Sequence, residues 1–106
     1  IFMELLAYRG LNDLDFTITF WRTNSGLEVD FILADAEIAI EVKIGDRIRS
    51  NTINNLKSFA ETYHPKRSII VNNSDEKRLL DSSGTKIEVI PWNMFLEELW
   101  SGKIIK

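Results

Sequence analysis

Three charged residues in the first half of the chain have the types and the spacing of a site for phosphate chemistry. Asp30 stands in the segment 27–31, LEVDF, and Glu41 and Lys43 stand in the segment 37–44, EIAIEVKI. Carboxylates are hard oxygen ligands that suit Mg²⁺, and a bound Mg²⁺ activates water and stabilises the charge that develops when a phosphodiester is cleaved. Lys43 adds a fixed positive charge. These residue types indicate a metal or phosphate site, provided that the fold brings them together.

A strand hairpin is the arrangement expected to bring these residues together. Both segments alternate apolar and other residues, so we predict strands over 27–34 and 37–44, joined by a two-residue turn. In the register set by that turn, Asp30 faces Glu41. Facing carboxylates destabilise a sheet by a few tenths to about 1 kcal/mol unless a cation lies between them. Lys43 is one candidate cation and a divalent metal ion is another. The opposite face is expected to anchor the core through Ile38, Ile40, Val42 and Ile44.

A solvent-exposed strand face is the simpler interpretation of the same charges. On this face, however, Ile32, Ala34 and Ala39 lie near the turn, whereas the charged residues gather at the other end. A plain solvent face has little reason to be divided in this way, so the site is favoured. Glu28 faces Lys43 in the same register, and we expect it to be a salt-bridge partner of that lysine rather than a metal ligand.

The remaining elements are expected to support this hairpin. Good helix formers precede Gly10 and predict a helix over 2–9. Alternation of apolar and polar residues before the turn-forming segment 24–26 predicts a strand, and helical spacing of apolar residues before Pro65 predicts a second helix. The expected elements in chain order are helix 2–9, strands 15–23, 27–34 and 37–44, helix 50–63, strand 66–72, a helical turn at 75–80, strand 86–90 and a last helix between Pro91 and Gly102.

The overall composition is typical of one soluble globular domain, with 106 residues, 44% of them apolar and 27% charged. The absence of cysteine excludes disulfides and thiolate metal sites, and the single histidine excludes sites that need several imidazoles. No apolar run approaches the roughly 20 residues that cross a bilayer. The net charge of −3 argues against non-specific polyanion binding by the chain as a whole. We expect a cytoplasmic protein without membrane association.

The pattern of acids and lysine resembles the PD-(D/E)XK nuclease-like superfamily, in which an Asp on one strand precedes an acid-x-Lys triple on the next. The segments 20–31, FWRTNSGLEVDF, and 89–96, VIPWNMFL, are more narrowly similar to the uncharacterised C-terminal domain that follows an AAA-type ATPase domain in many bacterial and archaeal proteins. This resemblance covers nearly the whole chain. It implies an α/β fold with a restriction-endonuclease-like α-β-β-β-α-β core, in which helices flank a mixed central sheet. Residues 1–106 are therefore expected to form a single nuclease-like domain, the C-terminal part of a longer ATPase-containing chain.

The same resemblance implies roles for individual residues. In active members of the superfamily, the Asp, the acid of the triple and the backbone carbonyl after that acid bind Mg²⁺, while the Lys positions water or stabilises charge. Carried over to this sequence, Asp30, Glu41 and the carbonyl of Val42 would bind Mg²⁺ or Mn²⁺, and Lys43 would be catalytic. Glu4 matches the acid that many such nucleases carry on the first helix, with a surface acid as the alternative.

Two functions follow from these expectations. The first is a Mg²⁺-dependent nuclease domain that hydrolyses phosphodiester bonds of DNA, with DNA and its own N-terminal ATPase domain as partners and a homo-oligomer left open. The second is a catalytically inactive nuclease-fold module that binds DNA or protein. Arg47 and Arg49 follow the triple and either hold flanking phosphates or lie in a solvated loop. The acidic pair and the lysine favour the first function, and the net negative charge favours the second.

Overall fold

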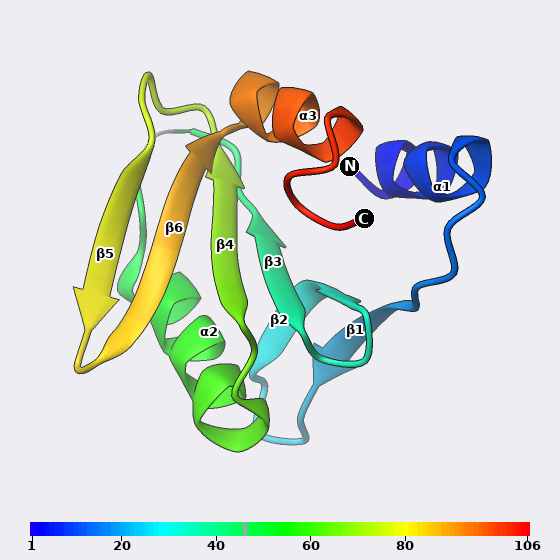
Figure 1. Cartoon of the computed structure of the whole chain (residues 1–106). Helices are drawn as coiled ribbons and strands as arrows, with labels where there is room; N and C mark the ends of the chain where they lie inside the picture. Colours follow the sequence, from blue (N-terminus) through cyan, green and yellow to red (C-terminus); the bar gives the residue numbers. More distant parts are fainter. Residues whose placement is uncertain (46) are drawn as a thin grey trace.

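The protein is a mixed α/β domain, described here by a computed structural model that covers residues 1–45 and 47–106 (Figure 1). Its elements begin with the expected α-β-β-β-α-β order and continue with a hairpin and a last helix. In chain order they are α1 (Phe2–Leu11), β1 (Ile18–Arg22), β2 (Glu28–Leu33), β3 (Ile38–Val42), α2 (Ser50–Tyr63), β4 (Arg67–Asn72), β5 (Arg78–Ser82), β6 (Thr85–Pro91) and α3 (Trp92–Trp100).

The described strands form one six-stranded mixed sheet in the order β1-β2-β3-β4-β6-β5. The β1–β2, β2–β3 and β5–β6 pairs are antiparallel, whereas β3–β4 and β4–β6 are parallel. Helix α2 provides the crossover between the parallel strands β3 and β4. The expected α/β class, with a mixed central sheet flanked by helices, is confirmed.

Each face of the sheet has its own apolar core, because the strands alternate their side chains between the two faces. The core under α1 and α3 includes Leu5, Ile40, Ile69, Val71 and Phe95. The core under α2 includes Ile32, Ala39, Leu56, Phe59 and Ile70. Helix α2 buries Thr52, Leu56 and Phe59 at helical spacing. It is capped after Tyr63 by His64, which lies in the left-handed region just before Pro65. No helix of the described ranges is long and apolar enough to cross a membrane.

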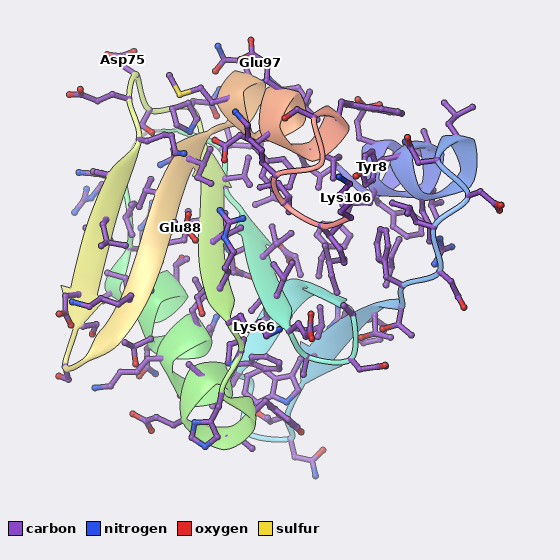
Figure 2. All side chains as sticks on the ribbon, viewed as in Figure 1. Tyr8, Lys66, Asp75, Glu88, Glu97 and Lys106 are labelled. Atoms are coloured by element: carbon purple, nitrogen blue, oxygen red, sulfur yellow. The ribbon has the colours of Figure 1, made fainter. Side chains whose placement is uncertain are left out.

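The C-terminal segment holds α1 against α3. Figure 2 shows Tyr8 and Lys106 close together at this junction. The hydroxyl of Tyr8 donates a hydrogen bond to the carbonyl of Ile105 at 2.6 Å, and its ring meets the ring of Trp100 edge-on at 5.4 Å between centroids. These contacts close the core on the α1 and α3 side of the sheet.

The helical turn expected at 75–80 is wrong, because strand β5 occupies Arg78–Ser82 at the edge of the sheet. It pairs with β6 through a two-residue turn at Ser83 and Gly84, both in the left-handed region. Across this turn, Nζ of Lys86 lies 2.6 Å from Oδ2 of Asp81. Pairing along the whole strand and a turn with hairpin geometry outweigh the local helix preference of the leucines in this segment.

Strand β3 is shorter than expected, and the prediction that Ile44 anchors the core is wrong, since its side chain is 98% exposed. The chain turns away from the sheet at Gly45, which has a φ of 95°. The turn is fixed by Asn73, whose side-chain oxygen accepts the N–H of Gly45 at 3.0 Å and whose own N–H donates to the carbonyl of Gly45 at 2.9 Å. Ile38, Ile40 and Val42 pack in the core under α1 and α3, as expected.

Candidate active site

The β2–β3 hairpin has the register that the sequence predicts. Phe31 pairs with Ile40, Ile32 with Ala39 and Leu33 with Ile38. The chain reverses over residues 34–37 rather than through a two-residue turn, since three consecutive residues from Ala34 to Ala36 have positive φ. One step beyond the paired residues, the register sets Asp30 opposite Glu41.

Asp30 and Glu41 lie where the paired part of the β2–β3 ladder ends, and each carboxylate bonds to the backbone of the other strand. The N–H of Asp30 donates to Oε1 of Glu41 at 2.6 Å. In return, the N–H of Val42 donates to Oδ2 of Asp30 at 2.9 Å. These reciprocal bonds replace strand-to-strand bonds and hold one oxygen of each carboxylate in place.

A β-bulge at Asp30 and Phe31 interrupts the pairing of β2 with β1. From Thr19 to Trp21, β1 advances by two residues, whereas the paired positions on β2, Ile32 and Val29, are three residues apart. The extra residue of β2 therefore lies in the pair Asp30–Phe31. As a result Val29 and Ile32, which are three residues apart, both pack in the core under α2. Bulges often re-aim a side chain beside a functional site.

Glu41 is fully buried, with 0% of its surface exposed. Its Oε2 has no hydrogen-bond partner among the described residues, although Nζ of Lys43 lies 3.3 Å away in an ion pair without hydrogen-bond geometry. Burial raises the pKa of Glu41, and the nearby charge of Asp30 raises it further. The N–H of Asp30 and the ammonium of Lys43 act in the opposite direction. A second cation would stabilise the ionised form of Glu41.

The donor set of Asp30, Glu41 and Val42 suits a hard divalent cation. The Oε2 of Glu41 is a buried oxygen without a hydrogen-bond donor, and the nearby carboxylate of Asp30 is held by the N–H of Val42. Within the described residues, no three His, Cys, Asp or Glu side chains form a group that could hold a metal. Mg²⁺ is commonly bound through one or two carboxylates together with water and substrate phosphates. The pair therefore fits a metal that is shared with a phosphate substrate.

The sequence profile of a domain of unknown function, DUF4143, matches residues 1–95. The chain belongs to this family. A search of curated proteins gave no match. The matched range contains Asp30, Glu41 and Lys43, so the acidic pair and its lysine lie within the DUF4143 domain proper. The family description gives no activity, and the chemistry has to be inferred from the site itself.

Glu4 is not brought to the acidic pair in this DUF4143 domain. Its Oε1 accepts a hydrogen bond from Nε1 of Trp100 at 3.2 Å, at the contact between α1 and α3. Glu41 pairs in register with Ile70, which packs under α2, so the two acids belong to opposite faces of the sheet. In this structure the acid on the first helix supports helix packing.

The prediction that Glu28 pairs with Lys43 is wrong. Oε2 of Glu28 lies 3.6 Å from Nε of Arg22, its direct partner in the β1–β2 ladder. The β2–β3 pairing ends at Phe31, so Glu28 is held by β1 rather than by β3. Lys43 is thereby left with Glu41 as its ion-pair partner among the described residues.

Arg47 and Arg49 are exposed on the connection between β3 and α2. Arg49 occupies the N-cap position of α2 and makes no side-chain capping bond. Both guanidinium groups are therefore available to solvent or to a polyanion. A cleft of about 570 Å³ lies between the start of α2 and Ser82, but neither arginine and none of the acidic pair lines it.

Sequence reasoning missed Asn72, a buried polar residue at the end of β4, next to β3. Only 1% of its surface is exposed. Its Oδ1 accepts hydrogen bonds from the N–H of Ser74 at 3.1 Å and from the Ser74 hydroxyl at 2.6 Å. Its Nδ2 has no partner among the described residues. The available sequence signal was an Asn that ends the apolar run 69–71, IIV, where the strand pattern predicts a buried position.

Proposed function

We propose that this DUF4143 domain hydrolyses phosphodiester bonds of DNA, using Mg²⁺ or Mn²⁺ held by Asp30 and Glu41 beside Lys43. The observation that carries the proposal is the buried Oε2 of Glu41, which has no hydrogen-bond partner among the described residues. It lies near the carboxylate of Asp30, which is itself held by the N–H of Val42. Lys43 forms an ion pair with this oxygen at 3.3 Å but without hydrogen-bond geometry. A buried anionic oxygen is costly unless it is both paired and hydrogen-bonded, so a metal cation at this position would lower the remaining cost.

Each residue has a distinct task in this reaction. Asp30 and Glu41 bind the cation and are oriented by the bonds between their strands, with the carbonyl of Val42 as a third ligand. When bound, Mg²⁺ supplies an activated water near neutral pH and offsets the charge that develops on the phosphate. Lys43 is 41% exposed at its side chain, so its ammonium reaches the solvent side of the pair and can contact the phosphate.

DNA, a preceding AAA-type ATPase domain and a cytoplasmic location form part of the same proposal. Arg47 and Arg49 are exposed on the connection between β3 and α2, which suits contacts to phosphates that flank the scissile bond. Contacts of this kind position a nucleic acid without reading its sequence. The self-association of the domain stays open.

A catalytically inactive module that binds DNA or protein is the second candidate. One observation favours it: Lys43 already forms an ion pair with Glu41 at 3.3 Å, which partly neutralises the acids without a metal. In this function, the reciprocal bonds of Asp30 and Glu41 serve to close the end of the β2–β3 ladder. The fold would then present a surface for a partner and perform no chemistry.

Incubation of the full-length protein with linear, nicked and branched DNA, in the presence of Mg²⁺ or Mn²⁺, separates the two functions. The informative variants are Asp30→Asn and Lys43→Ala, which are expected to lower the cleavage rate about 100-fold or more. The matched controls are Asp35→Asn, an exposed acid in the same hairpin, and Lys66→Ala, an exposed lysine after α2. Cleavage unchanged by Asp30→Asn and Lys43→Ala would refute the site. Metal-independent DNA binding without cleavage would favour the inactive module.

A further inference from the structure

Two buried side chains of the described residues contain a polar atom that lacks a hydrogen-bond partner: Oε2 of Glu41 and Nδ2 of Asn72. Glu41 is 0% exposed and Asn72 is 1% exposed. Leaving a buried donor or acceptor unpaired costs about 1–3 kcal/mol, so native proteins rarely retain one without a reason. An acceptor and a donor left open in the same part of a fold indicate a ligand that pairs with both.

The strand register places Asn72 next to the proposed active site. Strands β3 and β4 are parallel, with Glu41 paired to Ile70 and Val42 paired to Val71. The N–H of Lys43 continues this ladder by donating to the carbonyl of Val71 at 2.9 Å. The next position along both strands therefore sets Lys43 beside Asn72, at the carboxyl end of the two strands.

Alternation along the strands sets these side chains on one face of the sheet. Ile70 packs in the core under α2, and its partner Glu41 shares that face. Lys43 and Asn72 each follow two residues later on their own strands, so they return to the same face. Across β3 and β4, the side chains therefore run from the carboxylate of Glu41 to the ammonium of Lys43 and the amide of Asn72.

The orientation of the Asn72 amide follows from its contacts. The N–H of Ser74 can only donate, so the atom that accepts from it at 3.1 Å must be the amide oxygen. The hydroxyl of Ser74 bonds to the same oxygen at 2.6 Å. Both N–H groups of Nδ2 remain without an acceptor among the described residues. The Nδ2 of Asn72 therefore lacks a hydrogen-bond acceptor, and the positive charge of the neighbouring Lys43 favours an anionic acceptor.

We propose that Asn72 is a substrate-binding residue whose Nδ2 donates a hydrogen bond to an oxygen of the phosphodiester, beside Lys43. The inference rests on the proposed phosphodiester site and extends it from β2 and β3 onto β4. The acids on β2 and β3 take the cation, whereas Lys43 and Asn72 take the phosphate. Because the cation and the phosphate have separate ligands, the phosphate is oriented across β3 and β4, with its anionic oxygens toward β4.

Binding measurements on the full-length protein test this role without relying on cleavage. The probes are Mn²⁺ in calorimetry and a fluorescein-labelled DNA duplex in fluorescence anisotropy, with Ca²⁺ replacing Mg²⁺. Asn72→Asp retains the oxygen that accepts from Ser74 but removes both donors. Asn73→Asp is the matched control, because it adds the same charge one residue away and retains the oxygen that accepts the N–H of Gly45. Asn72→Ser, which adds no charge, is the second variant.

The expected result is at least about tenfold weaker DNA binding by both Asn72 variants, within the range for a lost hydrogen bond to a charged group. Asn73→Asp should stay within about threefold of the unmodified protein, a difference below 1 kcal/mol. Mn²⁺ affinity should persist in Asn72→Ser. Circular dichroism and urea unfolding identify variants that are folded.

Two other results would overturn the inference, and they differ in what they say about the proposed function. If folded Asn72 variants bind DNA as tightly as the unmodified protein while Mn²⁺ binding still depends on Asp30, the phosphodiester site stands and Asn72 has no part in it. If the unmodified protein shows no Mn²⁺ binding that depends on Asp30, the proposed site fails and the role of Asn72 fails with it.

Discussion

Asp30 and Glu41 exchange hydrogen bonds across the end of the β2–β3 ladder: the N–H of Asp30 donates to Glu41, and Asp30 accepts the N–H of Val42. Each carboxylate thus uses one oxygen to hold the opposite strand. Two like charges that would repel are kept adjacent by bonds to backbone donors, which favour the charged forms. The same bonds that maintain the hairpin also prepare a pair of acids for a cation.

Replacing Asp30 should separate metal binding from folding. Asp30→Asn retains a side-chain oxygen that can accept the N–H of Val42, so the free energy of unfolding should fall by no more than about 1.5 kcal/mol. Mn²⁺ binding, measured by calorimetry, should fall below detection because a formally anionic ligand is gone. Asp35→Asn, in the exposed turn of the same hairpin, should bind Mn²⁺ normally. Equal Mn²⁺ affinity in both variants would exclude Asp30 as a ligand.

Glu41 should make the metal-free protein less stable as the pH rises. Burial first, and then the charge of Asp30, raise its pKa in the folded state above the ordinary value of 4.5. Between the unfolded and folded pKa values, the folded protein binds more protons than the unfolded protein. Its stability therefore decreases as pH rises through that window, and the loss is complete above the folded pKa.

The isosteric variant Glu41→Gln removes this titration while keeping an oxygen for the N–H of Asp30. Its melting temperature, relative to that of the unmodified protein, should rise from about pH 4 to about pH 7 in the presence of a chelator. Glu37→Gln, an exposed acid at the other end of the hairpin, is the control and should leave the pH profile unchanged. A constant difference between Glu41→Gln and the unmodified protein over this range would contradict a raised pKa.

The sequence predicted the register of the β2–β3 hairpin better than it predicted the boundaries of the elements. Period-two alternation identified β2 and β3, and the register followed because a slip by one residue would have set Asp30 opposite Ile40 or Val42 and mixed the apolar and charged patterns. The bulge at Asp30–Phe31 was not predictable, since it depends on how β1 pairs with β2. Asn72 was also missed because its position depends on strand pairing rather than on the local sequence. Its proximity to Lys43 arises from the parallel β3–β4 pairing, and residues 29 positions apart carry no local signal.

Strand β5 shows the limit of local propensity. Its sequence, RLLDS, contains two adjacent leucines and no strict alternation, so the segment was expected to be a helical turn. The structure pairs it with β6 along five positions, and Leu79 remains 61% exposed on the sheet edge. Pairing with a neighbouring strand therefore decided the conformation, although the burial of this side chain contributed little.

The ion pair between Arg67 and Glu88 should stabilise the parallel part of the sheet. Nε and Nη2 of Arg67 donate to the two oxygens of Glu88 at 2.8 and 2.7 Å, and Nη1 donates to the carbonyl of Lys103 at 2.9 Å. Figure 2 shows Glu88 among the side chains of the central strands. Arg67→Lys cannot reproduce this forked geometry and should lower the free energy of unfolding by about 1 kcal/mol in urea titrations.

The matched comparison for that ion pair is Lys66→Arg, which changes the neighbouring exposed pair with Glu37. It should leave the urea midpoint unchanged, because exposed ion pairs typically contribute less than about 1 kcal/mol. Equal midpoints for Arg67→Lys and the unmodified protein would mean that the forked bonds add no net stability.

The β5–β6 turn offers a stabilising substitution. Ser83 and Gly84 have φ values of 52° and 92°, so both central residues of this two-residue hairpin lie in the left-handed region. Asn tolerates that region better than Ser, and Asn-Gly is the preferred pair for such a turn. Ser83→Asn should therefore raise the free energy of unfolding by a few tenths to about 1 kcal/mol in urea titrations. Ser83→Val should lower it, because β-branched side chains are strained at positive φ. A destabilised Ser83→Asn variant would show that the serine contributes interactions beyond the turn geometry.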